Sequence, residues 1–211
     1  GWRTNQRKHL ITTQEKGKVG DTRELLVHII YLHFASIMAW LTLLYAIVLP
    51  NIGGIAHAFV IKEHVREWYD KKIKKPSWRP PNKAFGPVWT LLYCLMGYAS
   101  YRVWVTLDEP NVMSLTTLPT PLKLFLLQLF LNWIWTPIFF VYKHLTLALF
   151  EILLLDASVA MTMFAFWKED VLAGLLLIPY MAWLALATAL TTSIWISNPG
   201  WRFGQDSKKK K

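Results

Sequence analysis

The feature that most limits how this chain can fold is the separation of its charged residues from its apolar ones. Residues 84–107 contain a single charged side chain, Arg102, and residues 124–142 and 171–201 contain none. Runs of about 20 apolar residues are long enough to cross the hydrocarbon core of a bilayer as helices. Over the whole chain 17% of residues are charged, whereas soluble domains average about 25%. Because a soluble helical bundle would need polar faces on these segments, the sequence predicts a polytopic membrane protein.

The apolar runs also set the number of spans. A further apolar run covers residues 25–61, and as one helix it would reach about 56 Å at 1.5 Å per residue, well beyond the hydrocarbon. We therefore expect one span at residues 41–62, kinked near Pro50. Because lipid offers no hydrogen bonds to the backbone, each span is expected to be helical. The prediction is an all-α bundle of five transmembrane helices, at about residues 41–62, 84–107, 120–142, 145–167 and 171–196.

The domain organisation follows from these spans. We expect an N-terminal extension over residues 1–40, polar at first and then apolar and interfacial, a five-helix membrane domain over residues 41–201, and a basic tail over residues 202–211. Fourteen Lys and Arg residues lie on the side of the first loop (residues 62–83) and the C-terminus, against eight on the other side. The positive-inside rule then predicts that the first loop and the C-terminus are cytosolic.

Charge and polar residues give little sign of catalysis or metal binding. The net charge of +10 is spread over loops and tails, which indicates attraction to anionic lipids rather than to nucleic acid. The six histidines lack the spacing of a zinc site. Glu151 and Asp156 lie about 140° apart on a helix, so they do not form an acid–base pair. Asp156 is expected to be protonated or hydrogen-bonded toward the protein.

Aromatic and polar side chains recur at helical spacing on three of the spans. Packing between helices is one explanation of these stripes. A cavity lined by indole rings is the other, favoured by Gln128 and Asn132, which must face protein or a cavity rather than lipid. The stripes consist of Phe85, Trp89, Tyr93, Met96 and Ser100, of Gln128, Asn132, Trp135 and Phe139, and of Trp183, Ala187 and Leu190.

Four motifs carry a resemblance to a known family. They are W-Y-x5-K-P-S-W-x-P-P at residues 68–81, F-G-P-V-W-T-L-L-Y-x3-G-Y-A-S-Y-x-V-W at 85–104, L-N-W-I-W-T-P-I-F-F at 131–140 and P-Y-M-A-W-L-A-L-A-T-A-L at 179–190. Together they resemble the TspO/translocator protein family, also called peripheral benzodiazepine receptors, over about residues 41–201.

The resemblance implies a five-helix bundle whose first loop, carrying Trp78, folds over the mouth of an internal pocket. The ligands of the family are porphyrins and haem, cholesterol, and benzodiazepine-type drugs. In bacterial relatives the tryptophans that match Trp89 and Trp183 are linked to light-dependent porphyrin breakdown. The pocket implied by matching positions consists of Ala58, Ile61, Phe85, Val88, Trp89, Asn132, Trp135, Leu154, Trp183, Ala187 and Leu190.

Three departures from the family pattern bear on ligands and partners. Thr192 and Ile196 stand where the cholesterol-recognition segment has a tyrosine and a basic residue. Bulky residues around Lys123 and Leu127 replace the glycines through which some relatives dimerise, so a homodimer would lack the usual interface. Leu147 replaces a pocket tryptophan of animal members.

The resemblance and the residues together predict an integral membrane receptor or carrier. Its expected ligands are porphyrin or haem and sterol-like or benzodiazepine-type molecules, with no cofactor or metal required and membrane lipids as partners. By resemblance its location is the outer mitochondrial membrane or the endoplasmic reticulum. Two alternatives stay open: a light- or oxidant-dependent enzyme that degrades porphyrin at its tryptophans, and a purely structural or interaction protein of the membrane.

Overall fold

The computed structural model describes residues 2–107 and 116–204, with side chains described for residues 24–57, 59–107 and 116–204. Every regular element within these ranges is helical, which confirms the predicted all-α fold. The tail beyond residue 204 lies outside the described part. The chain divides into two compact units, residues 1–42 and residues 43–211, and the helical bundle belongs to the second.

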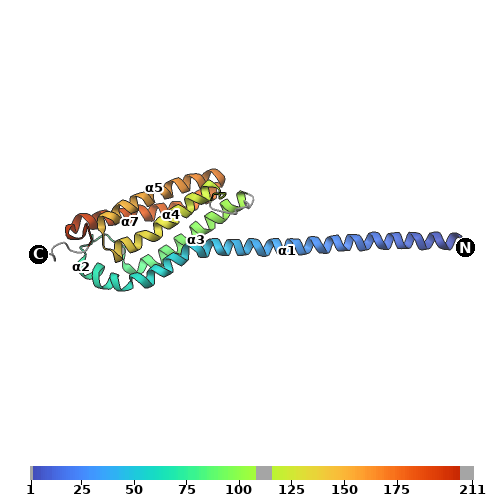
Figure 1. Cartoon of the computed structure of the whole chain (residues 1–211), viewed down its shortest axis with the longest axis horizontal. Coiled ribbons are helices and arrows are strands. Elements are labelled where there is room, and N and C mark those ends of the chain that lie inside the picture. Colours follow the sequence, from blue (N-terminus) through green and yellow to red (C-terminus); the bar gives the residue numbers. More distant parts are fainter. Residues whose placement is uncertain (1, 108–115, 205–211) are drawn as a thin grey trace. The chain divides into compact units, whose positions relative to one another are not determined.

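The five predicted spans fall on helices, two of them interrupted. α5 packs against both α4 and α7, and α3 contacts all three of these helices (Figure 1). Short helical turns precede α3 and follow α7. The long helices are α1 (Trp2–His64), α3 (Asn82–Thr106), α4 (Thr120–Thr136), α5 (Leu145–Glu169) and α7 (Ile178–Ser197), and the shorter elements are η1 (Val65–Tyr69), α2 (Asp70–Lys72), η2 (Pro137–Val141), α6 (Val171–Leu176) and η3 (Pro199–Trp201).

Length and composition agree with a membrane location. Four helical stretches of the described chain are long and apolar enough to cross a bilayer. α3 has 25 residues and packs among them as the fifth helix of the bundle. The four stretches are Glu24–Lys72, Thr120–Val141, Leu145–Glu169 and Val171–Ser197.

Prolines explain two differences from the predicted spans. The span predicted at 120–142 ends in a π-helical turn that begins at Pro137, because proline has no N–H to donate and its ring crowds the carbonyl four residues earlier. The span predicted at 171–196 is broken at Leu177 into α6 and α7. Pro179 causes this break for the same reason, since it occupies the first turn of α7.

The first helix differs from the prediction at its start. It begins at Trp2 rather than near residue 41 and continues through Pro50. The sequence has no proline before Pro50, so nothing in residues 2–49 stops a helix as strongly as proline does. In the first unit, the apolar side chains of residues 25–34 are exposed, among them Leu25, Ile29 and Phe34.

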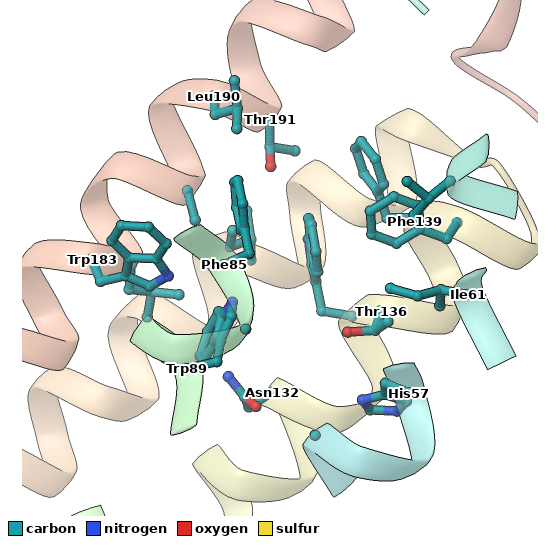
Figure 2. Close-up of a pocket in the computed structure, with 18 of the residues that line it drawn as sticks. His57, Ile61, Phe85, Trp89, Asn132, Thr136, Phe139, Trp183, Leu190 and Thr191 are labelled. Atoms are coloured by element: carbon teal, nitrogen blue, oxygen red, sulfur yellow. The ribbon is translucent and has the colours of Figure 1, made fainter. Parts of the chain in front are cut away.

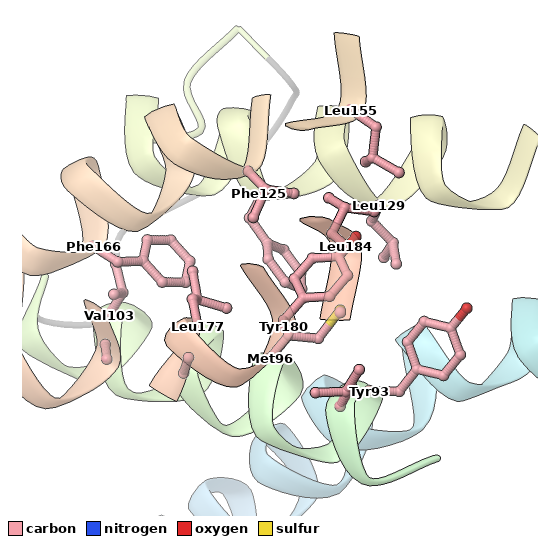
Figure 3. Packing of buried hydrophobic residues seen from close by; sticks show 14 of the residues in the cluster. Tyr93, Met96, Val103, Phe125, Leu129, Leu155, Phe166, Leu177, Tyr180 and Leu184 are labelled. Atoms are coloured by element: carbon pink, nitrogen blue, oxygen red, sulfur yellow. The ribbon is translucent and has the colours of Figure 1, made fainter. Parts of the chain in front are cut away.

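The core of the bundle is built from large apolar side chains of four helices (Figure 3). Met96 and Val103 of α3 belong to the same buried cluster as Phe125 and Leu129 of α4. Phe166 of α5 stacks on Phe125 with ring centroids 6.0 Å apart. In lipid, such close packing rather than the exclusion of water holds helices together.

Glycines bring α1 close to the bundle. A Cβ atom on Gly97 of α3 would collide with the backbone carbonyl of Ala46, and one on Gly53 would collide with the Trp133 ring. The missing side chain of Gly97 lets the backbones of α1 and α3 come into contact, and that of Gly53 leaves room for the Trp133 ring on α4. Small residues have this role in membrane helices.

One ion pair joins the ends of two helices. Arg102 Nη2 of α3 lies 2.6 Å from Asp170 Oδ2, and Arg102 Nε donates to the same oxygen at 2.9 Å. The other carboxylate oxygen of Asp170 accepts from the Ala173 N–H at 2.9 Å, so the residue also caps α6. The hydrogen bonds from Arg102 hold the pKa of Asp170 below its usual value.

Candidate functional site

A cavity of about 400 Å³ lies inside the second unit, among α1, α3, α4, α5 and α7. Figure 2 shows side chains entering it from several helices, with Trp183 of α7 on one side and His57 and Ile61 of α1 on the other. Its volume is within the range of about 300–1,000 Å³ that small-molecule sites occupy.

Aromatic rings form much of the cavity wall. The ring centroids of Phe85 and Trp183 lie 5.5 Å apart in an edge-on arrangement. Trp89 stacks on Tyr93 at 5.4 Å, and on α4 Trp135 stacks on a phenylalanine. Spacings of four residues on α3 place its aromatic rings on one helix face. The wall therefore offers flat apolar surfaces from three different helices.

A buried hydrogen-bond chain forms the polar part of the site. Tyr93 Oη donates to Asn132 Oδ1 at 2.8 Å, and Asn132 Nδ2 donates to Tyr180 Oη at 3.0 Å. Both tyrosines and the asparagine are buried. Asn132 lines the cavity and Gln128 is buried in the protein, so the prediction that both avoid lipid is confirmed.

The first loop is fastened to the end of α7. Asn198 Oδ1 accepts from the Lys74 N–H at 2.9 Å, and Asn198 Nδ2 donates to the Lys74 carbonyl at 2.9 Å. Before the loop, Trp68 and Tyr69 are buried in a second apolar cluster with Phe139. Tyr69 and Asn82, which flank the loop, line the cavity. The loop thus begins and ends at the cavity.

The structure brings most of the predicted pocket residues to one place. Two of the others lie elsewhere: Trp78 of the first loop is 51% exposed, and Leu154 of α5 is 45% exposed on the outside of the bundle. Val88 packs against the main core and Ala58 lies outside the residues whose side chains are described. Those that line the cavity are Ile61, Phe85, Trp89, Asn132, Trp135, Trp183, Ala187 and Leu190.

Several lining residues were not predicted. His57 lies four residues before Ile61 on α1, so helical spacing from a predicted residue would have found it. Thr136 follows Trp135 and Thr191 follows Leu190, both predicted pocket residues. Neither threonine belonged to a pattern that would have predicted it. Tyr69 belongs to the W-Y pair of the first motif, whose second residue turns out to face the cavity.

The intramembrane acids do not form a reactive pair. Thr188 Oγ1 of α7 donates to Asp156 Oδ2 at 2.8 Å, which confirms that Asp156 is hydrogen-bonded toward the protein. Glu151 is buried, and neither it nor Asp156 lines the cavity. Among the described residues no three side chains of His, Cys, Asp and Glu come together as a metal site would require.

Comparison with known proteins identifies the fold family. Residues 46–196 match the TspO/MBR family. The chain is 42% identical to the translocator protein of Homo sapiens over 157 residues, covering 74% of this chain and 89% of that protein. It is 40% identical to protein CrtK of Rhodobacter capsulatus over 133 residues (63% and 79%), and 34% identical to the tryptophan-rich protein TspO of Archaeoglobus fulgidus over 147 residues (69% and 89%).

The family match covers all five helices of the bundle, and the four long apolar stretches agree with it. The predicted polytopic membrane protein is therefore confirmed. This chain is an integral membrane protein that belongs to the TspO/MBR family.

Proposed function

We propose that this chain is a membrane receptor or carrier that binds a flat, mostly apolar ligand in its internal cavity. The ligand is a porphyrin, haem, or a sterol-like or benzodiazepine-type molecule. The observation that supports this best is the meeting of Phe85, Trp89, Trp135 and Trp183, from three helices, around one cavity of about 400 Å³.

The chemistry of the wall suits such a ligand. Indole and phenyl rings stack on flat conjugated molecules and gain dispersion energy over a large area. Asn132, Thr136 and Thr191 supply a few hydrogen-bonding groups along the same wall, which is the usual composition of a small-molecule site.

A cavity-filling substitution tests the proposal. Ala187 lines the cavity, whereas Ala182 on the same helix is exposed and does not. Ala187→Phe should weaken binding at least tenfold, or about 1.4 kcal/mol, because the added ring occupies the ligand's space. Titration of tryptophan fluorescence with protoporphyrin IX, haem and cholesterol measures the affinity.

Ala182→Phe adds the same ring on the outside of the helix and serves as the matched control. Its affinity should equal that of the parent chain. Unchanged affinity in Ala187→Phe, with the chain folded, would show that ligands bind elsewhere.

A second candidate function is light-dependent porphyrin breakdown. It is favoured by one observation, that Trp89 and Trp183 both line the cavity. Replacing both by phenylalanine should keep porphyrin binding but slow the loss of porphyrin absorbance under illumination. Equal loss in the parent and in the folded double variant would exclude a redox role for these rings.

The location follows from the same proposal. We place the first loop and the C-terminus in the cytosol, and the protein in the outer mitochondrial membrane or the endoplasmic reticulum. The excess of Lys and Arg on the side of the first loop and the C-terminus supports the orientation. Imaging of the full chain beside markers of both organelles decides between them.

A further inference from the structure

His57 is a potential metal ligand in the wall of the cavity. We propose that its imidazole binds the metal of a metallated tetrapyrrole as an axial ligand, so that the site selects metalloporphyrins over metal-free porphyrins and sterols. This inference rests on the proposed function, since it names the ligand class for the same cavity.

The position of His57 is the first argument. Its side chain is half-buried and lines the cavity, and in Figure 2 it enters from α1, with Asn132 nearby and Trp183 on the far side. The other histidines with described side chains, at positions 28, 33, 64 and 144, do not line the cavity.

The freedom of the ring nitrogens is the second argument. Among the described residues, nothing forms a hydrogen bond with either nitrogen of His57, whereas His33 Nδ1 lies 2.9 Å from a backbone oxygen and His144 Nδ1 accepts from a backbone N–H. A histidine that only packed in a core would be expected to have such a partner. His57 therefore has a nitrogen available for a ligand.

The composition of the wall is the third argument. None of the described lining residues is Asp, Glu, Lys or Arg, and Cys94 is not among them. Apart from the phenols of Tyr69 and Tyr93, the second of which already donates to Asn132, imidazole is the side chain of the described wall best suited to a transition metal. The site also lacks a carboxylate that would hold His57 as an imidazolium.

One histidine is enough only if the metal brings its other ligands. A free metal ion needs three or four protein ligands, and the described residues offer no such group. A porphyrin supplies four nitrogens in its plane, so a single histidine completes the attachment, as in globins and peroxidases. The aromatic wall provides the surface against which the macrocycle packs.

The experiment compares three porphyrins on the full chain in detergent micelles. Ferric haem, zinc protoporphyrin and metal-free protoporphyrin IX are titrated into the parent, His57→Ala and His57→Gln, with absorbance spectra recorded at each step. Both variants should bind haem at least tenfold more weakly and show a shifted Soret band. Metal-free protoporphyrin should bind all three chains within about twofold, and added imidazole should restore the parent-like haem spectrum in His57→Ala.

His64→Ala is the matched control, because His64 lies seven residues further on the same helix and outside the cavity. It should leave the haem spectrum and affinity unchanged. An unchanged haem affinity and Soret band in folded His57→Ala or His57→Gln overturns the inference.

The remaining outcomes separate this inference from the function it rests on. If His57→Ala weakens metal-free protoporphyrin as much as haem, His57 only packs against the ligand, and the inference fails while the binding function stands. If none of the three porphyrins binds the parent chain, tetrapyrrole binding itself is wrong and the role of His57 falls with it.

Discussion

Asn132 connects three helices through one amide group. Its oxygen accepts from Tyr93 of α3 and its nitrogen donates to Tyr180 of α7, while the residue itself belongs to α4. A buried hydroxyl that loses its hydrogen-bond partner destabilises the fold. The amide therefore fixes both tyrosines, and Tyr93 in turn supports Trp89 by stacking.

Asn132→Leu should lower stability, because it leaves two buried hydroxyls without their partner. We expect a loss of about 1–2 kcal/mol, the scale of interhelical hydrogen bonds in membranes, measured by thermal unfolding in detergent. Thr90→Val is the control, since Thr90 donates to the carbonyl of Gly86 on its own helix. Equal stability of Asn132→Leu and Thr90→Val would contradict the bridging role.

At the scale of elements, the junction between α5 and α6 depends on Asp170. The carboxylate caps α6 with one oxygen and binds Arg102 of α3 with the other. The break after α6 leaves a helix of 6 residues, too short to be stable by itself. The cap and the ion pair hold this short helix against α3.

Asp170→Asn should destabilise the bundle at neutral pH by about 1 kcal/mol, the upper range for partly exposed pairs. Because Arg102 lowers the pKa of Asp170 in the folded chain, the stabilisation is fully present above the ordinary aspartate pKa of about 3.9. It disappears as the pH falls through the lower folded value. The free energy of unfolding should be measured from pH 6 to pH 2. The parent chain should lose the stabilisation from ionised Asp170 over this range, whereas Asp170→Asn should lack it at every pH. A constant difference between the two chains would contradict the role of ionisation.

The sequence predicted the elements well where one physical signal dominated. Long apolar runs with few charged residues located the spans, because runs of about 20 such residues are long enough to cross a bilayer. The breaks at Pro137 and Leu177 were missed because a proline inside an apolar run stops a helix in some contexts and is tolerated in others, as Pro50 is.

The site was predictable in part for a similar reason. Helical spacing placed Phe85, Trp89 and Asn132 on faces that meet around the cavity. Spacing gives the face of a helix but not which neighbour that face meets. Leu154 therefore lies outside the bundle although its family counterpart suggested a pocket position. His57 was overlooked although it lies one helical turn before Ile61, a predicted pocket residue.

At the scale of the whole molecule, the distribution of Lys and Arg between the two sides of the membrane controls the orientation of the chain. Cys94 is the single cysteine, so a chain with Cys94→Ala offers a background without thiols. Ser77 in the first loop and Lys123 at the start of α4 are both exposed.

Ser77→Cys in that background should react with an impermeant maleimide added to sealed mitochondria or microsomes, because we place the first loop in the cytosol. Lys123→Cys should react only after the membrane is opened with detergent. Gel-shift labelling measures both, and the opposite pattern would reverse the proposed orientation.

The paired hydrogen bonds between Asn198 and Lys74 have a consequence for time rather than for affinity. They fasten the first loop, whose two ends border the cavity, to the end of α7. A ligand that enters and leaves past this loop must wait for the same two bonds to break in either direction. The fastening then slows arrival and departure by one common factor and leaves their ratio, the dissociation constant, unchanged. For a ligand that passes this loop, the side chain of Asn198 would therefore set the residence time in the site without changing the dissociation constant.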